Sequence, residues 1–231
     1  MTDSNLLQPA EAYLQARCEG LRLEQQKGHW GIICPDIPFF SIDFLQGKMA
    51  YRATQILAKE WVVKACLATK PATVIYDLTA GLGRDAFLMA KCGASVVMVE
   101  RNPVMAFLLQ DALMRLNQTE IGQALNLSLR HQNSIGLTDF SPQPNTVLYL
   151  DPMHPARKSK GQVKQDIRVV QSVAGKDEDK LQLFDWAMQQ TVKRVVLKWP
   201  LKVARLTDKK PATIYKGRST LFEVHVPSMH V

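Results

Sequence analysis

Apolar runs that suit buried strands alternate with helix-like spacing along most of this 231-residue chain. Runs of four to six apolar residues predict strands, and apolar positions recurring every three to four residues predict the helices between them. The expected strands are 74–78, 95–99, 126–130, 146–150 and 194–198. The expected helices end near Gly93, span 103–117 and span 181–191. Such repeated strand–helix units predict a parallel sheet with helices on both faces.

The two ends of the chain depart from this alternation. Residues 213–216 and 221–226 predict a hairpin that turns at Gly217-Arg218 and adds an antiparallel edge. Before residue 50, Gly and Pro punctuate short runs such as 31–34 and 39–44, which predicts short strands joined by turns. We therefore expect an α/β fold with a mostly parallel seven-stranded sheet. Residues 1–50 would form a small β-rich N-terminal region and residues 51–231 the main domain.

One helix is expected to open the main domain. Ile56, Leu57, Val63 and Leu67 recur at helical spacing, so the pattern predicts a single helix over 51–68.

Composition narrows the class of protein. With 46% hydrophobic residues the chain can build a substantial core, and its net charge of +8 favours an anionic partner such as nucleic acid. Cys18, Cys34, Cys66 and Cys92 form no C-x-x-C pair, which indicates reduced thiols and neither a disulfide frame nor a zinc site. The five histidines show no ligand spacing, so no metal is expected. No apolar run suits a membrane span and the N-terminus lacks a signal-peptide pattern, so we expect a cytoplasmic protein.

A glycine-containing loop, Asp77-Leu-Thr-Ala-Gly81-Leu-Gly83-Arg84-Asp85, connects the first main-domain strand to its helix. Glycine permits a tight turn and lets a cofactor approach the backbone. Glu100 ends the next strand, where its carboxylate could accept both ribose hydroxyls of a nucleotide. The spacing fits a dinucleotide fingerprint as well as a nucleoside-containing cofactor without phosphates, and also a tight turn that binds nothing.

The charges beside the glycines favour the cofactor without phosphates. A carboxylate at Asp85 would repel a diphosphate at the start of the helix. S-adenosylmethionine carries a sulfonium and an ammonium, which suit Asp77 and Asp85, while Arg84 could face its carboxylate. The loop therefore favours S-adenosylmethionine over NAD.

A second loop, Asp151-Pro152-Met-His154-Pro155, follows the strand at 146–150. The amino group of a nucleic-acid base is a poor nucleophile, because its lone pair is delocalised into the ring. Asp151 and the carbonyl of Pro152 could each accept one amine hydrogen, and His154 could stack on the base. The competing interpretation is a proline-stiffened loop in which Asp151 caps a helix and His154 is structural.

Basic residues are concentrated after this second loop and again near the C-terminus. The first group is expected to grip RNA phosphates, although a solvated helix face has the same pattern. Its members are Arg157, Lys158, Lys160, Lys164 and Arg168. The second group is Lys198, Lys202, Arg205, Lys209, Lys210, Lys216 and Arg218. Trp199 lies within the second group, where it suits either core packing or stacking on a base.

These motifs together resemble a known family, the bacterial small-subunit ribosomal RNA guanine-N2 methyltransferases of the J type. The resemblance extends over about 40–200. The matching segments are Ile42-Asp-Phe44 with Gly47 and Arg52, Asp77–Phe87, Glu100-Arg-Asn-Pro103, Tyr149-Leu-Asp-Pro-Met153, Arg168-Val-Val-Gln-Ser172 and Arg194-Val-Val-Leu-Lys198. The glycine loop alone is shared by all class I methyltransferases, whereas the combined order is specific.

The resemblance implies a cytoplasmic class I (Rossmann-like) enzyme that uses S-adenosylmethionine. Its substrate would be N2 of one guanosine, position 1516, in 16S ribosomal RNA or the small ribosomal subunit, methylated by direct in-line transfer. The implied cofactor contacts are Arg84, Asp85, Glu100, Arg101, Asn133, Ser134 and Asp151. Two positions depart from the family pattern: His154 stands where phenylalanine is expected, and Asn133 replaces the first of two serines.

Two other functions remain compatible with the residues alone. An NAD(P)-dependent oxidoreductase would use the glycine loop and Glu100 but would leave Asp151 and Pro152 without a role. A non-catalytic RNA-binding protein would account for the positive charge and nothing more.

Overall fold

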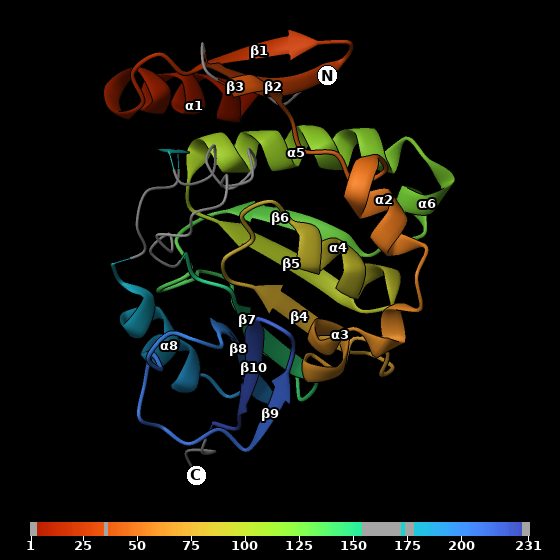
Figure 1. The fold of residues 1–231 in the computed structure, drawn as a ribbon, viewed down its shortest axis with the longest axis vertical. Coiled ribbons are helices and arrows are strands. Elements are labelled where there is room, and N and C mark those ends of the chain that lie inside the picture. The colour runs from red at the N-terminus through yellow and green to blue at the C-terminus, as the bar shows by residue number, and fades with distance from the viewer. Residues whose placement is uncertain (1–3, 35–36, 154–171, 174–177, 228–231) are drawn as a thin grey trace.

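A seven-stranded sheet forms the centre of the computed structural model, which describes residues 4–34, 37–153, 172–173 and 178–227 (Figure 1). The strand order is β6-β5-β4-β7-β8-β10-β9. The parallel strands are β4 (Val74–Asp77), β5 (Ser95–Glu100), β6 (Leu127–His131), β7 (Thr146–Leu150) and β8 (Arg194–Pro200). β10 (Thr220–His225) runs antiparallel to β8 and to β9 (Thr213–Lys216). The expected α/β fold with its C-terminal hairpin is confirmed.

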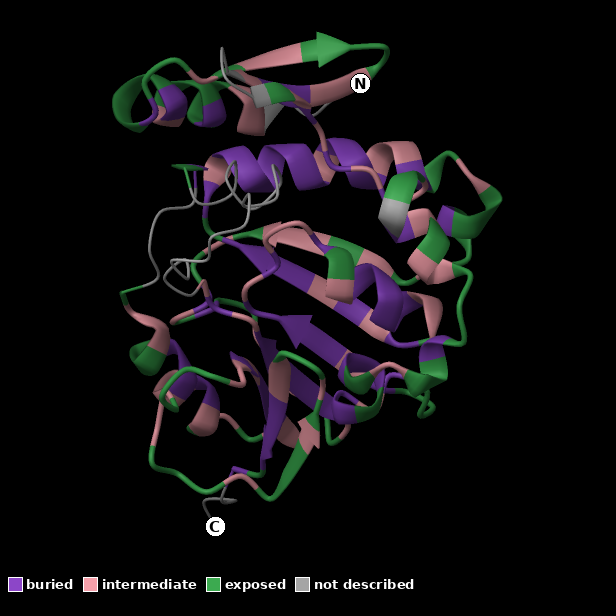
Figure 2. Cartoon of the chain, viewed as in Figure 1, coloured by how far each residue is buried: buried purple, intermediate pink, exposed green. Residues whose placement is uncertain are grey.

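Helices cover both faces of this sheet, and alternate residues of each strand point to opposite layers. One layer contains α3 (Trp61–Ala65), α4 (Arg84–Lys91) and α5 (Pro103–Asn117), and it packs on strand residues such as Ile75 and Val147. The other contains α8 (Lys180–Met188), which packs on Leu148 and Leu197. The short α6 (Glu120–Gln123) links α5 to β6. Buried residues fill the central strands and α5 (Figure 2).

The N-terminal residues form a small layer on the outer side of α5 (Figure 1). It consists of α1 (Ser4–Arg17) and a three-stranded antiparallel sheet. The strands are β1 (Arg22–Gln26), β2 (His29–Cys34) and β3 (Ile37–Phe40). Trp30 packs edge-on against Phe107 of α5, with 5.3 Å between the ring centroids. Short strands are therefore present as expected, although β3 ends at Phe40 and the rest of the run 39–44 is not strand; α1 was not predicted, and the domain boundary at residue 50 stays a prediction.

The single helix expected over 51–68 is wrong. The chain instead forms α2 (Gly47–Ala53), the 3-10 turn η1 (Leu57–Lys59) and α3. Glu60 is extended at ψ 135°, and its carboxylate binds Arg52 through two hydrogen bonds of 3.0 Å. Ile56 is 67% exposed, so it does not share a buried face with Leu57. The ion pair closes a turn that a continuous helix could not make.

Gly83 sets the junction between the glycine loop and α4. It is the N-cap residue of α4 and has φ 66°, in the left-handed region that favours glycine. A Cβ at this position would lie 2.9 Å from Leu109 Cδ2 and Met98 Sδ and 3.0 Å from Phe44 Cζ. The glycine therefore allows both the turn and the close approach of α4 to the core.

Replacing Gly83 with alanine is expected to lower the free energy of unfolding by about 2–4 kcal/mol, the sum of left-handed strain and crowding. Gly28→Ala is the matched control, since Gly28 has φ 80° but no atom lies within 4 Å of the position that a Cβ would take there. The control should lose roughly 1–2 kcal/mol from backbone strain alone. Denaturant unfolding of the three proteins measures both losses. Equal losses for the two variants would contradict the crowding around Gly83.

Candidate active site

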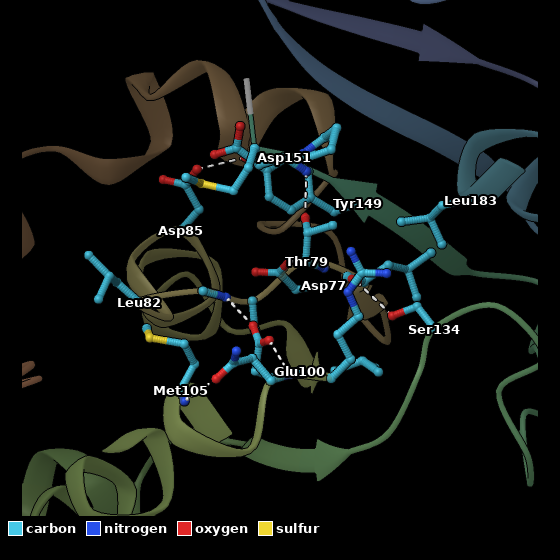
Figure 3. A pocket seen from close by; sticks show the side chains of 18 of the residues that line it. Asp77, Thr79, Leu82, Asp85, Glu100, Met105, Ser134, Tyr149, Asp151 and Leu183 are labelled. Carbon is cyan, nitrogen blue, oxygen red and sulfur yellow. Dashed lines mark hydrogen bonds between the residues drawn. The ribbon is translucent and has the colours of Figure 1, made fainter. Parts of the chain in front are cut away.

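A cavity of about 440 Å³ opens at the carboxyl ends of the central strands (Figure 3). Open α/β sheets bind ligands at this edge. In Figure 3 Asp85, Tyr149 and Asp151 lie on one side of the cavity, Glu100 and Met105 lie on the other, and Thr79 lies between them. The cavity thus brings both sequence motifs to one place.

The glycine loop and the end of β5 are joined through Glu100. The backbone N–H of Gly81 donates to Glu100 Oε2 at 2.9 Å, and that of Asn102 donates to Oε1 at 2.8 Å. Asn102 caps α5 by accepting from the N–H groups of Val104 and Met105. Because a carboxylate has about four lone-pair sites, Glu100 can hold this loop and still accept hydroxyl groups.

Asp77 ends β4 at the floor of the cavity and is only 2% exposed. Its Oδ1 accepts a hydrogen bond of 3.2 Å from the N–H of Thr79. Burial, and then the nearby carboxylates of Asp85 and Asp151, raise the pKa of Asp77 well above its usual value. A cation placed beside this carboxylate would relieve that cost.

Lys198 of β8 joins the two motifs directly. Its Nζ donates to Asp151 Oδ2 at 2.6 Å and to Asp85 Oδ2 at 2.8 Å. Burial disfavours the charged lysine, but the two carboxylates outweigh burial and raise the pKa of Lys198 above its usual value. Lys198 therefore remains an ammonium group between two carboxylates.

Asp85 lies at the other end of this network. Its Oδ2 also accepts from the hydroxyl of Tyr149 at 2.6 Å, and its Oδ1 lies 3.6 Å from a guanidinium nitrogen of Arg52. Burial opposes ionisation, but Lys198, Tyr149 and Arg52 together hold the pKa of Asp85 below its usual range. The carboxylate is thus ionised and already paired within the protein.

The Asp151 loop is fixed to the glycine loop by its backbone as well. The N–H of Asp151 donates to Thr79 Oγ1 at 2.6 Å. Leu150 of β7 pairs with Leu197 of β8, so the residues that follow them, Asp151 and Lys198, lie side by side. Pro152 is buried, whereas the Asp151 side chain is 34% exposed to the cavity. This arrangement holds a carboxylate at the mouth of the cavity.

Most of the predicted site residues line this cavity. They are Asp77, Gly81, Arg84, Asp85, Glu100, Arg101, Asn133, Ser134, Asp151 and Pro152. Gly83 instead packs behind the loop. His154 and the predicted RNA-binding residues lie outside the described residues; they are Arg157, Lys158, Lys160, Lys164 and Arg168.

Three cavity residues have roles that the sequence did not reveal. The sequence alone places Lys198 in the C-terminal basic group and Tyr149 in a buried strand, and it gives Thr79 no role. The alternation of side chains along each strand could have indicated these positions. Lys198 lies on the same face of the sheet as Val196, and Tyr149 lies on the same face as Val147.

Arg205 of the C-terminal basic group and the nearby Trp199 also make contacts within the protein. Arg205 pairs with Glu223, with 2.9 Å between Nε and Oε1. Trp199 is 4% exposed and donates to the carbonyl of Ala204 at 2.8 Å, so it packs in the core.

The acidic and sulfur-containing side chains of the described ranges do not form a metal centre. No group of three or more His, Cys, Asp or Glu suited to a metal ion occurs among those residues. Within them, no helix is long and apolar enough to cross a bilayer. Cys18, Cys66 and Cys92 are free thiols, and burial raises the pKa of each.

The residues around the cavity fit S-adenosylmethionine. Glu100 suits the ribose hydroxyls, the buried Asp77 suits a cationic group, and Met105 and Ile135 offer apolar contacts to an adenine. The volume falls within the range of about 300–1,000 Å³ common for cofactor sites. Fold and site together define a class I S-adenosylmethionine-dependent methyltransferase.

Comparison with known proteins gives the family. Residues 6–227 match the SAM-dependent methyltransferase family, and the chain belongs to it. Proteins named ribosomal RNA small subunit methyltransferase J are its relatives. The one from Shewanella piezotolerans is 40% identical over 83% of this chain and 74% of its own length. The one from Coxiella burnetii (strain Dugway 5J108-111) is 38% identical over 80% and 74%.

A solved structure supports the same assignment. The SAM-dependent methyltransferase from Neisseria gonorrhoeae superposes with a TM-score of 0.71 at 26% identity, covering 99% of this chain and 96% of that one. The chain is therefore a methyltransferase, and neither an oxidoreductase nor a non-catalytic RNA-binding protein.

Replacing Asp77 with asparagine is expected to raise stability at neutral pH and to weaken cofactor binding. Because the folded pKa of Asp77 lies above its unfolded value, wild-type stability falls as pH rises above about 4, where only the unfolded chain ionises. Asparagine at position 77 does not ionise, so the variant avoids this loss of stability. Its side-chain oxygen can still accept the hydrogen bond from the N–H of Thr79. Urea unfolding at pH 5 and pH 7.5 should show the larger gain at pH 7.5.

The control for this substitution is Asp139→Asn, at an exposed loop position. It should change neither stability nor the calorimetric affinity for S-adenosylmethionine. If Asp77→Asn matches the wild type in stability at both pH values, the buried carboxylate carries no such cost.

Proposed function

We propose that this enzyme methylates the exocyclic N2 of a guanosine in 16S ribosomal RNA, using S-adenosylmethionine. The observation that carries the proposal is the Asp151–Pro152 loop, which Lys198 and Thr79 fix at the mouth of the cofactor cavity. The names of the relatives support small-subunit ribosomal RNA as the substrate. The net charge of +8 suits an RNA partner.

The loop supplies the acceptors that an aromatic amine needs. The lone pair of N2 is delocalised into the guanine ring, so the nitrogen attacks poorly while it remains planar. A hydrogen bond from N2 to Asp151 and another to the Pro152 carbonyl would favour tetrahedral geometry and direct the lone pair. Proline lacks an N–H, so it adds no competing donor beside the amine.

Lys198 acts in this proposal as a positioning residue. It holds Asp151 Oδ2 at 2.6 Å, and the carboxylates of Asp151 and Asp85 in turn raise the pKa of Lys198, which keeps the lysine charged. A carboxylate accepts several hydrogen bonds, so Asp151 can bind the amine while Lys198 remains bound. The lysine is in turn held by Asp85, which the hydroxyl of Tyr149 orients. The orientation of Asp151 is therefore set by residues from three elements.

S-adenosylmethionine, when bound, would supply a methyl group made electrophilic by its positively charged sulfur, with the neutral thioether as the leaving group. Asp77, Arg84 and Glu100 would hold its charged and ribose groups. Asn133 and Ser134 line the same cavity, and Ser134 is held by a 2.6 Å hydrogen bond to the carbonyl of Leu78. Most of the rate gain would come from positioning, and the excess amine proton would leave to water.

Asp151→Ala is expected to reduce kcat for methyl transfer by about 100-fold or more, because the amine loses its charged acceptor. The affinity for RNA should change much less. Asp185→Asn is the matched control, since Asp185 pairs with Lys209 on the surface. Single-turnover kinetics, with fluorescence anisotropy for RNA and calorimetry for the cofactor, separates catalysis from binding. Full activity of Asp151→Ala would rule out the amine-holding role.

The substrate itself is tested by a tritiated methyl-transfer assay on small subunits and 16S ribosomal RNA that lack the modification. Digestion to nucleosides should place the label in N2-methylguanosine. Label in another nucleoside would overturn the guanine-N2 assignment, and label in neither RNA would overturn the RNA substrate.

A further inference from the structure

Three large hydrophobic side chains lie exposed within one short stretch, 51–61. Tyr51 is 70% exposed, Ile56 is 67% exposed and Trp61 is 38% exposed. Tyr51 and Trp61 are also the only aromatic residues among the large exposed hydrophobics of the described chain. Single exposed apolar residues are ordinary, whereas a group of them indicates an interaction site. We call Tyr51, Ile56, Trp61 and the neighbouring Lys64 the aromatic surface.

Trp61, at one end of this stretch, lies at the edge of the sheet where the cavity opens. Pro200, two residues after Lys198, pairs with Thr220 at the start of β10. The β9–β10 turn at 217–219 therefore lies beside the carboxyl end of β8. The ring of Trp61 lies 5.7 Å from that of Tyr215 and against Gly217. Trp61 is thus fixed beside the hairpin turn at the active-site edge.

Arg52 connects the aromatic surface to the wall of the cavity. Its guanidinium binds Glu60 through two hydrogen bonds and lies 3.6 Å from Asp85. Tyr51 precedes Arg52 in the chain, and Trp61 follows Glu60. The two exposed aromatic residues therefore flank an ion pair that touches the carboxylate network of the site.

The chemistry of this surface suits unpaired nucleotides. Aromatic faces stack on bases without regard to sequence, and nearby cations meet the phosphates. Lys64 Nζ lies 4.7 Å from the centroid of the Trp61 ring, and Lys59 is exposed in the same stretch. The only acid between 51 and 64, Glu60, is paired with Arg52. The charge of the stretch is therefore complementary to RNA.

We propose that the aromatic surface holds the nucleotides next to the target guanosine while that base enters the cavity. A base that leaves its stack exposes the faces of its neighbours, and Tyr51 and Trp61 offer replacement stacking partners. The proposal rests on the proposed function for the identity of the RNA and adds the place where the RNA docks.

Tyr51→Ala and Trp61→Ala are each expected to weaken binding of an unmodified 16S ribosomal RNA transcript by about tenfold. Trp61→Phe should restore most of the affinity, because phenylalanine can still stack. Lys64→Gln should reduce the salt dependence of binding by about one phosphate contact. Val226→Ala is the matched control, since Val226 is 59% exposed and follows His225, which pairs with Val195 near the start of β8 and so lies away from the carboxyl edge.

Fluorescence anisotropy measures RNA affinity, calorimetry with S-adenosylmethionine checks that each variant retains its site, and methyl transfer is followed in parallel. Unchanged RNA affinity in Tyr51→Ala, with an active wild type, overturns the docking surface and leaves the proposed function standing. If RNA binding depends on Tyr51 and Trp61 but the wild type transfers no methyl group to the RNA, the docking surface stands and the proposed function is overturned. If the variants lose affinity for a protein of the small subunit but keep their affinity for RNA, the proposal of an RNA docking surface is also overturned.

Discussion

The ammonium group of Lys198, placed between the carboxylates of Asp85 and Asp151, is the interaction on which this active site depends. The cavity is lined by several carboxylates, among them Asp85, Asp151 and the buried Asp77, and their mutual repulsion would oppose folding without a compensating cation. Lys198 pairs with Asp85 and Asp151, so its single positive charge balances one of their two negative charges, and Arg52 adds a second positive group beside Asp85. A cationic cofactor beside Asp77 would favour the ionised form of this buried carboxyl group, which burial and the neighbouring carboxylates otherwise oppose.

This interaction also explains why distant parts of the chain meet at the site. Lys198 comes from β8, Asp85 from the first turn of α4 and Asp151 from the end of β7, while Arg52 brings the α2–α3 segment to the same point. Gly83 lets α4 begin close enough to the core for Asp85 to reach Lys198. The site is therefore built by the sheet edge together with a segment that precedes the sheet.

Much of this arrangement could be predicted from the sequence, because it depends on local signals. Buried parallel strands are continuous apolar runs, and a glycine loop with an acid at the next strand end points to one edge of the sheet. The side-chain partners of Lys198 depend instead on strand order and register, which one sequence does not specify. The break near Ile56 was missed because the Arg52–Glu60 pair, eight residues apart, outweighs a helical apolar pattern. Helix α1 was missed because its apolar residues form only a weak periodic pattern around Pro9.

A double-mutant cycle on methyl transfer, using Lys198→Met, Asp151→Asn and the combined variant, tests most directly whether Lys198 acts through Asp151. If Lys198 acts by holding Asp151, its removal should slow the single-turnover rate in the wild type and have little further effect once Asp151 is replaced. The combined variant would then be about as slow as Asp151→Asn alone. Independent losses that multiply in the combined variant would contradict the account.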